Sequence, residues 1–339
     1  MGAYRLFLAG LVLLSHLGIT AYGLNLGVVA VVSFLLLSGF VMTALISRNF
    51  ASLDRVRLFY ADRVMRLFPQ YLFYLALTLA VDLWLGPVTS YTQGITAFKV
   101  AMNALMLPLA FYQFGLSDCL IVPPAWTLGL ECTFYAIIPF LLIYKCRSIA
   151  FAISVVVFLL AYLSVINTDI WGYRLLPGVL FIFLTGSLIY EQASTRRAIA
   201  LLAIWLGMSA LLLGLLRIDA AKAPWNREVL LGMIVGLPAV LALSRRKSGS
   251  IDALLGNLSY GVFLNHTVIV TIFKASGSDI SRPASAAAII AVSIVMSYIT
   301  FTLVEKPVIS LRRSIRYKPS PDVTGALATL QATPSDRPD

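Results

Sequence analysis

Residues 26–47 read LGVVAVVSFLLLSGFVMTALIS and contain no charged side chain. About 20 apolar residues in a helix cross the hydrocarbon core of a bilayer, so this stretch predicts a membrane-spanning helix. The rest of the chain has the same character: of 339 residues, 60% are hydrophobic and 12% are charged, and the mean hydropathy is +0.89. Because an ordinary soluble domain carries about a quarter charged residues, the composition excludes a soluble globule and a disordered chain.

Similar apolar stretches recur along the chain and predict an all-α polytopic membrane bundle of about ten transmembrane helices. The predicted spans are residues 5–23, 26–47, 68–86, 125–145, 148–166, 174–190, 198–216, 228–244, 256–273 and 285–304. Residues 95–112 are also apolar, but a lysine, an asparagine and a proline interrupt them, so we expect a re-entrant or interfacial segment there. Residues 54–66 mix basic and apolar side chains, which predicts a short amphipathic helix on the cytoplasmic surface, with Pro69 at the entry to the third span.

The basic residues report on topology. The net charge is +11, and the 26 Lys and Arg residues flank apolar stretches instead of forming one dense stripe, which disfavours nucleic-acid binding. Placing both termini in the cytoplasm puts most of these residues on the cytoplasmic side, as the positive-inside rule requires. We therefore expect a membrane domain over residues 1–307 and a basic, then disordered, cytoplasmic tail over residues 308–339.

Two histidines, His16 and His266, fall inside predicted spans. Ionisable side chains are costly in a bilayer and usually face a polar cavity or a partner, although a lone histidine also serves as a hydrogen bond between helices. Arg5 precedes His16 by eleven residues, which returns the helix to within roughly 20° of the same face, about 16 Å along the axis. One helix face thus carries a cation at the cytoplasmic mouth and an imidazole deeper in the membrane, which suits a long ligand with an anionic head and a reactive tip. The alternative for Arg5 is a topology anchor.

Arg5 and His16 match the Arg-(ten residues)-His pattern of the acyltransferase-3 family of membrane acyltransferases, which the chain resembles in five further segments. These segments are 33–40 (Phe-Phe-x-x-Ser-Gly-Phe, with Ser33 where the first Phe is common), 59–69 (Arg-x-x-Arg-x-x-Pro), 124–131 (Trp-Ser-Leu-x-x-Glu, with Thr127 for Ser), 255–266 (Gly-x-x-Ser-Tyr-x-x-Tyr-Leu-x-His, with Phe263 for Tyr) and 304–307 (Glu-x-Pro). The segments follow in the family's order across residues 5–307, so the resemblance is specific.

The resemblance implies transfer of an acyl group, usually acetyl, from cytoplasmic acyl-CoA to a hydroxyl of a surface or secreted carbohydrate. The expected acceptor is an exopolysaccharide, lipopolysaccharide or lipo-oligosaccharide, and the expected location is the bacterial inner membrane. Acetyl-CoA is then a donor substrate, and no cofactor is bound tightly. The identity of the acyl group and of the acceptor stays open, as does the choice between direct transfer and an acyl-histidine intermediate.

Five residues are the main candidates for the site. Arg63 and Arg66 lie one helical turn apart and can share a face on the side of Arg5. Because arginine binds phosphate through paired hydrogen bonds, we expect these three to hold the phosphates of CoA, the alternative being a lipid-headgroup face. We expect His16, neutral in the membrane interior, to act as general base toward the acceptor hydroxyl. Glu131 is expected at the same depth, where it orients His16, unless it pairs with a helix end.

Other candidates come from the same segments. They are His266, Trp126, Ser259, Tyr260 and Glu305. His266 is interpreted as an acceptor contact, a second proton carrier or a structural hydrogen bond, and Trp126 as a sugar platform or an interfacial aromatic residue. For Glu305 we expect a structural pairing with an arginine. The long outer loop of residues 87–124 is the candidate for acceptor contact.

Two other classes of function fit the composition. A carrier or flippase for a lipid-linked glycan also needs polar residues inside the membrane and basic loops, and a membrane scaffold needs no chemistry at all. Transfer of label from acetyl-CoA to a carbohydrate, abolished by His16→Ala, would distinguish acyl transfer from the other two. Metal, ATP-driven and soluble-hydrolase chemistry have no sequence support, because the three cysteines have no ligand spacing and no P-loop or nucleophile-elbow motif occurs.

Overall fold

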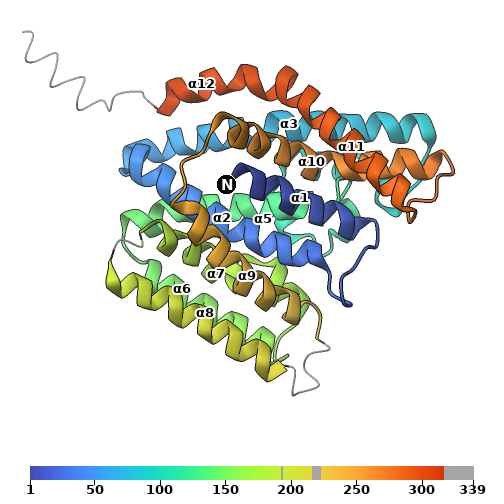
Figure 1. Ribbon diagram of the computed structural model, residues 1–339. Coiled ribbons are helices and arrows are strands. Elements are labelled where there is room, and N and C mark those ends of the chain that lie inside the picture. Colours follow the sequence, from blue (N-terminus) through green and yellow to red (C-terminus); the bar gives the residue numbers. More distant parts are fainter. Residues whose placement is uncertain (192–193, 216–222, 317–339) are drawn as a thin grey trace, which may run out of the picture.

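The computed structural model describes residues 1–191, 194–215 and 223–316, and over these residues the chain is all-α (Figure 1). Its α-helices are α1 (Gly2–His16), α2 (Leu26–Asn49), α3 (Val56–Leu85), α4 (Ala97–Leu105), α5 (Ala125–Ile143), α6 (Arg147–Tyr162), α7 (Leu176–Tyr190), α8 (Thr195–Leu215), α9 (Asn226–Ser244), α10 (Ser250–Ala275), α11 (Pro283–Thr300) and α12 (Lys306–Arg316). Among them, α2, α3, α5 and α7 to α11 are long and apolar enough to cross a membrane, and α1 and α6 are shorter apolar helices. These helices coincide with the ten predicted spans, so the all-α membrane bundle is confirmed. The side of the membrane that holds each terminus stays a prediction.

Helix α2 runs through the middle of the bundle, with α1 on one side and α7 and α9 on the other (Figure 1). The side chain of Asn25 caps its N-terminus by accepting hydrogen bonds from the backbone N–H groups of Gly27 and Val28. Gly39 lies directly against the backbone carbonyl of Phe183 on α7, where a β-carbon would overlap the oxygen. A residue without a side chain is therefore required here for the close approach of α2 and α7.

Helices α1 and α10 lie side by side and run in the same direction. At one end, the amino group of Met1 pairs with Asp252 at 2.9 Å. At the other end, the ring of His16 meets the ring of His266, with 4.9 Å between centroids. This parallel pairing brings two segments that are distant in sequence into one wall of the site.

Helix α1 ends earlier than the sequence analysis predicted. We expected a span over residues 5–23, whereas the helix stops at His16. Gly18 adopts a positive φ of 80°, and the N–H of Ile19 donates to the carbonyl of Leu14. This is the glycine-dependent termination that closes many helices. His16 therefore stands at the C-terminal end of α1 instead of deep within it.

Helix α3 corrects a second prediction. Residues 54–66 do not form a separate surface helix, because α3 continues without a break from Val56 to Leu85 and contains Pro69 inside it. Two charged side chains in its first half are buried against other elements: Asp62 is fully buried and Arg63 is 7% exposed. Ion pairs between Asp62 and arginines replace the contacts with water that these charged side chains would make on a surface helix.

The remaining expectations concern short segments. Within residues 95–112, α4 is only nine residues long, about 13 Å, and a 3-10 turn over Leu107–Phe111 follows it, so the segment is too short to cross a bilayer. Of the predicted tail, residues 308–316 belong to α12. Residues 317–339 lie outside the described residues.

Candidate active site

Two cavities lie between the helices and adjoin one another. The larger, the arginine cavity, has a volume of about 490 Å³ and is lined by residues that include Arg5, Arg66 and Glu131. The smaller, the histidine cavity, has a volume of about 310 Å³, and His16 lines it. Three residues line both cavities: Val31, Thr127 and Phe263. These side chains form the partition between the two.

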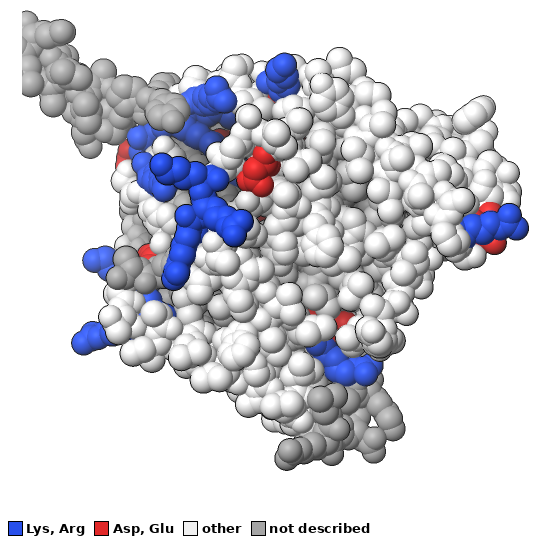
Figure 2. Space-filling view, viewed as in Figure 1, with Lys and Arg blue, Asp and Glu red and all other residues white. Residues whose placement is uncertain are grey.

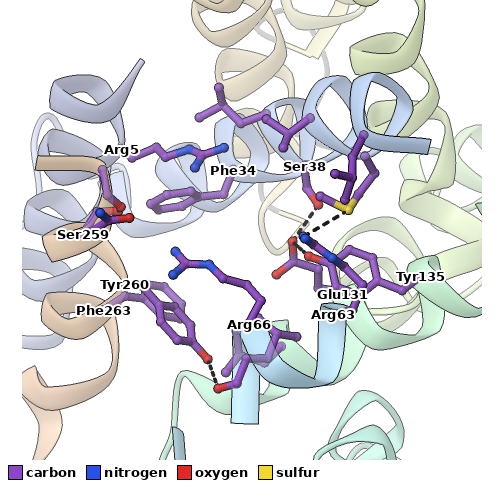
Figure 3. A pocket seen from close by; sticks show the side chains of 18 of the residues that line it. Arg5, Phe34, Ser38, Arg63, Arg66, Glu131, Tyr135, Ser259, Tyr260 and Phe263 are labelled. Carbon is purple, nitrogen blue, oxygen red and sulfur yellow. Dashed lines mark hydrogen bonds between the residues drawn. The ribbon is translucent and has the colours of Figure 1, made fainter. Parts of the chain in front are cut away.

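The arginine cavity lies toward the end of the molecule that holds the N-terminus, because Arg5 is in the first turns of α1. On the face drawn in Figure 2, Lys and Arg gather at that same end, near α12. Arg5 from α1 and Arg66 from α3 point into one space, with the ring of Phe34 between them (Figure 3). The predicted grouping of these arginines in one cavity is therefore present.

Arg66 and Arg63 are both held in place by acidic residues. Arg66 pairs with Glu305, and its guanidinium lies over the ring of Tyr260 at 5.2 Å from the centroid. The structure thus supplies the arginine partner expected for Glu305. Arg63 pairs with Asp62 and is largely buried, which the sequence analysis did not foresee. The side chains of Arg63 and Arg66 nevertheless both line the cavity, as their spacing predicted.

Glu131 also belongs to the arginine cavity, which corrects the predicted contact with His16. Its carboxylate accepts hydrogen bonds from the hydroxyls of Ser38 at 2.6 Å and Tyr135 at 2.5 Å (Figure 3). The difference arises because α1 ends at His16, whereas Glu131 lies six residues inside α5, which begins at Ala125. The sequence analysis assigned no chemical role to Ser38 and missed its hydrogen bond to Glu131.

His16 lines the histidine cavity with an exposed side chain. The ring of His266, fully buried, lies edge-on beneath it. His266 Nδ1 is 3.1 Å from the carbonyl oxygen of Val262, while its Nε2 has no hydrogen-bond partner among the described residues. The two histidines therefore share one site, and His16 is the one that a ligand in the cavity can reach.

Aromatic rings and one arginine form the rest of the histidine cavity. Arg174 lies over the ring of Trp126 at 5.0 Å and over that of Tyr173 at 5.4 Å. Its Nε donates to Asp169 at 2.7 Å. Trp126 is buried in this cluster, so it is not a lipid-facing interfacial residue. In the sequence analysis Arg174 was only one of the 26 basic residues that report on topology. Its position at the end of a predicted span, beside apolar residues, did not indicate a place in the site.

Two further predicted residues, Ser259 and Tyr260, line the arginine cavity from α10. The hydroxyl of Ser259 donates to the carbonyl of Gly256 at 2.8 Å. The hydroxyl of Tyr260 donates to the carbonyl of Leu67 at 2.8 Å and thereby ties α10 to α3. Both side chains are thus engaged with backbone, and they shape the cavity wall.

Comparison with known proteins assigns the family. Residues 3–302 match the acyltransferase-3 family, whose model is described as an acyltransferase domain. The chain belongs to this family. It is also 34% identical over 200 residues to an uncharacterized protein of Aquifex aeolicus (strain VF5), over 57% of this chain and 90% of the relative. No solved structure is significantly similar to the chain.

The family match gives the two cavities a chemical meaning. An acyltransferase brings together a donor and an acceptor, and this acyltransferase has two adjoining cavities of different character. One is rich in arginine and the other exposes an imidazole. The match to the family model ends at residue 302, and α12 (Lys306–Arg316) follows it, beginning within the Glu-x-Pro segment.

Proposed function

We propose that this membrane acyltransferase moves an acyl group, acetyl in the simplest case, from acyl-CoA to a hydroxyl of a surface or secreted carbohydrate. The supporting observation is the pair of adjoining cavities, partitioned by Val31, Thr127 and Phe263. A donor whose phosphates rest among the arginines extends its thioester toward this partition. The acceptor hydroxyl approaches from the other side, where His16 stands.

The proposed chemistry is general-base catalysis by His16. The imidazole accepts the proton of the acceptor hydroxyl while the hydroxyl oxygen bonds to the thioester carbonyl carbon. When the carbon–sulfur bond breaks, the CoA thiolate leaves and takes the proton from the imidazolium, which restores the neutral base. His266 supports His16 by ring contact at 4.9 Å. Glu131 lines the arginine cavity, so in this proposal it faces the donor and does not orient His16.

A carbohydrate acceptor agrees with the lining of the histidine cavity. Ligand sites combine apolar and aromatic walls with a few placed polar groups, and here Trp126 and Tyr173 supply rings while Arg174, paired with Asp169 outside the lining, supplies a polar group. Residues of the 87–124 loop, among them Tyr112, also line this cavity. We place the enzyme in the bacterial inner membrane, with the arginine cavity toward the cytoplasm.

The test is transfer of label. Membranes that contain the protein are incubated with acetyl-CoA labelled in the acetyl group and with surface glycan from cells that lack the gene. We expect label in the glycan and none when His16→Ala replaces the wild type at equal abundance. Label transfer at the wild-type rate by the variant would contradict the role of His16, and a glycan carrier would transfer no label in either case. Mass spectrometry of glycans with and without the gene then identifies the acyl group and the acceptor.

A further inference from the structure

Helix α12 (Lys306–Arg316) covers one side of the arginine cavity although it begins after residue 302, where the match to the family model ends. Three of its arginines, Arg312, Arg313 and Arg316, line the cavity. In Figure 1 the helix lies across the bundle next to α3, to which it packs. Its place against the cavity therefore depends on what fixes it to α3.

The anchor is Asp62, a fully buried carboxylate on α3. Besides Arg63, it accepts hydrogen bonds from Arg316, with Nε at 2.8 Å, and pairs with Arg312 at 3.5 Å. Arg55 adds a hydrogen bond from its guanidinium to the carbonyl of Arg316 at 3.1 Å. A buried carboxylate with several arginine partners fixes the helix in one position, because separating them would leave a charge buried without a partner.

The cavity then carries more positive than negative charge. Its lining contains six arginines, which are Arg5, Arg63, Arg66, Arg312, Arg313 and Arg316. Against them stand Glu131 and Glu305 in the lining and Asp62 beside it. Among the described residues this leaves an excess of three positive charges. Arg5 and Arg313 have no carboxylate partner there, and Arg313 is exposed while it lines the cavity.

We propose that α12 completes the donor site and that Arg313 binds a phosphate group of the nucleotide part of the donor. This inference rests on the proposed function, since it takes acyl-CoA as the donor. Of the three arginines predicted from the sequence, Arg63 and Arg66 already have carboxylate partners. A donor with several phosphate charges supplies the negative charge that the cavity lacks, and arginine suits phosphate by its forked geometry.

The test compares a donor with phosphates and one without. Purified protein in detergent is assayed with acetyl-CoA and with S-acetylpantetheine, which has the same thioester but no phosphate. We expect Arg313→Gln to raise KM for acetyl-CoA about three- to tenfold and to leave KM for S-acetylpantetheine unchanged. Lys306→Gln, which removes one charge from the same helix outside the cavity lining, is the matched control and leaves both values unchanged. An equal effect of Arg313→Gln on both donors, or none on either, overturns the proposal.

A binding measurement separates this inference from the proposed function. Adenosine 3′,5′-bisphosphate, titrated into the wild type and Arg313→Gln by calorimetry, should bind the variant about three- to tenfold more weakly. If the wild type transfers no acetyl group yet shows this difference, the phosphate site stands and the proposed reaction fails. If transfer occurs and the bisphosphate binds wild type and variant equally, α12 has no part in donor binding.

Discussion

The two cavities of this acyltransferase are built by different means. In the arginine cavity, buried or half-buried carboxylates fix the cations: Asp62 holds Arg63, and Glu305 holds Arg66. In the histidine cavity, aromatic rings hold the cation: the guanidinium of Arg174, paired with Asp169, lies over the rings of Trp126 and Tyr173. Under the proposed function, the cavity built on ion pairs binds the donor and the aromatic cavity binds the acceptor.

The largest expected effect separates chemistry from donor binding. His16→Ala should lower kcat about 10²- to 10⁴-fold, because a positioned base contributes that much, and should leave the Kd of CoA unchanged. Steady-state kinetics and calorimetry with CoA measure the two quantities. Arg5→Gln is the counterpart on the other side of the partition, and it should weaken CoA binding. A variant of His16 that lost CoA affinity as strongly as activity would show that the two cavities are not separate in function.

The next effect concerns the free energy of unfolding and the ion pairs of Asp62 beside the arginine cavity. Asp62→Ala leaves Arg63 and Arg312 without their buried carboxylate, so we expect the free energy of unfolding to fall by about 3–5 kcal/mol. Thermal unfolding in detergent measures the loss. Asp279→Ala is the control, because its pair with Arg282 is exposed to solvent and should leave the melting temperature unchanged. Equal melting temperatures for the two variants would contradict an anchoring role for Asp62.

Much of this arrangement could be predicted from the sequence, because it depends on local spacing. Uncharged stretches located the spans, the three-residue spacing put Arg63 and Arg66 into one cavity, and both histidines, which meet in the structure, were among the candidates for the site. The predicted contact between Glu131 and His16 was wrong because the prediction continued the first helix to residue 23, whereas α1 ends at His16. Gly18 gave the signal for that end, and it was outweighed by the apolar residues that follow.

The remaining features required the fold. Asp62 meets Arg312 and Arg316 across about 250 residues of sequence, and no local pattern reports such a pairing. Arg174 acquires its ring neighbours from α5 and from the loop that carries Tyr112. A charge near a span end looks the same in sequence whether it faces water or a cavity, so its role appears only when distant elements are assembled.

A smaller effect is expected from the aromatic side. Arg174→Gln should raise KM for the acceptor about tenfold, because it removes a charged hydrogen-bond donor from a partly buried site, and should leave KM for acetyl-CoA unchanged. Initial rates with each substrate varied in turn make the distinction. Arg282→Gln, an exposed arginine paired with Asp279, is the matched control. A rise in both KM values would mean that Arg174 supports the bundle as a whole and does not select the acceptor.

The smallest effect tests how Glu131 is held on the donor side. Ser38→Ala removes one of two short hydrogen bonds to the carboxylate, and Tyr135 keeps the other, so we expect kcat to fall only about two- to fivefold. Tyr135→Phe should behave similarly, and the double variant should lose more than the product of the single losses, because Glu131 then has neither donor. Rates of the four proteins at saturating substrate give the coupling. Strict multiplicativity would contradict this coupling and would show that the two hydroxyls act on Glu131 independently.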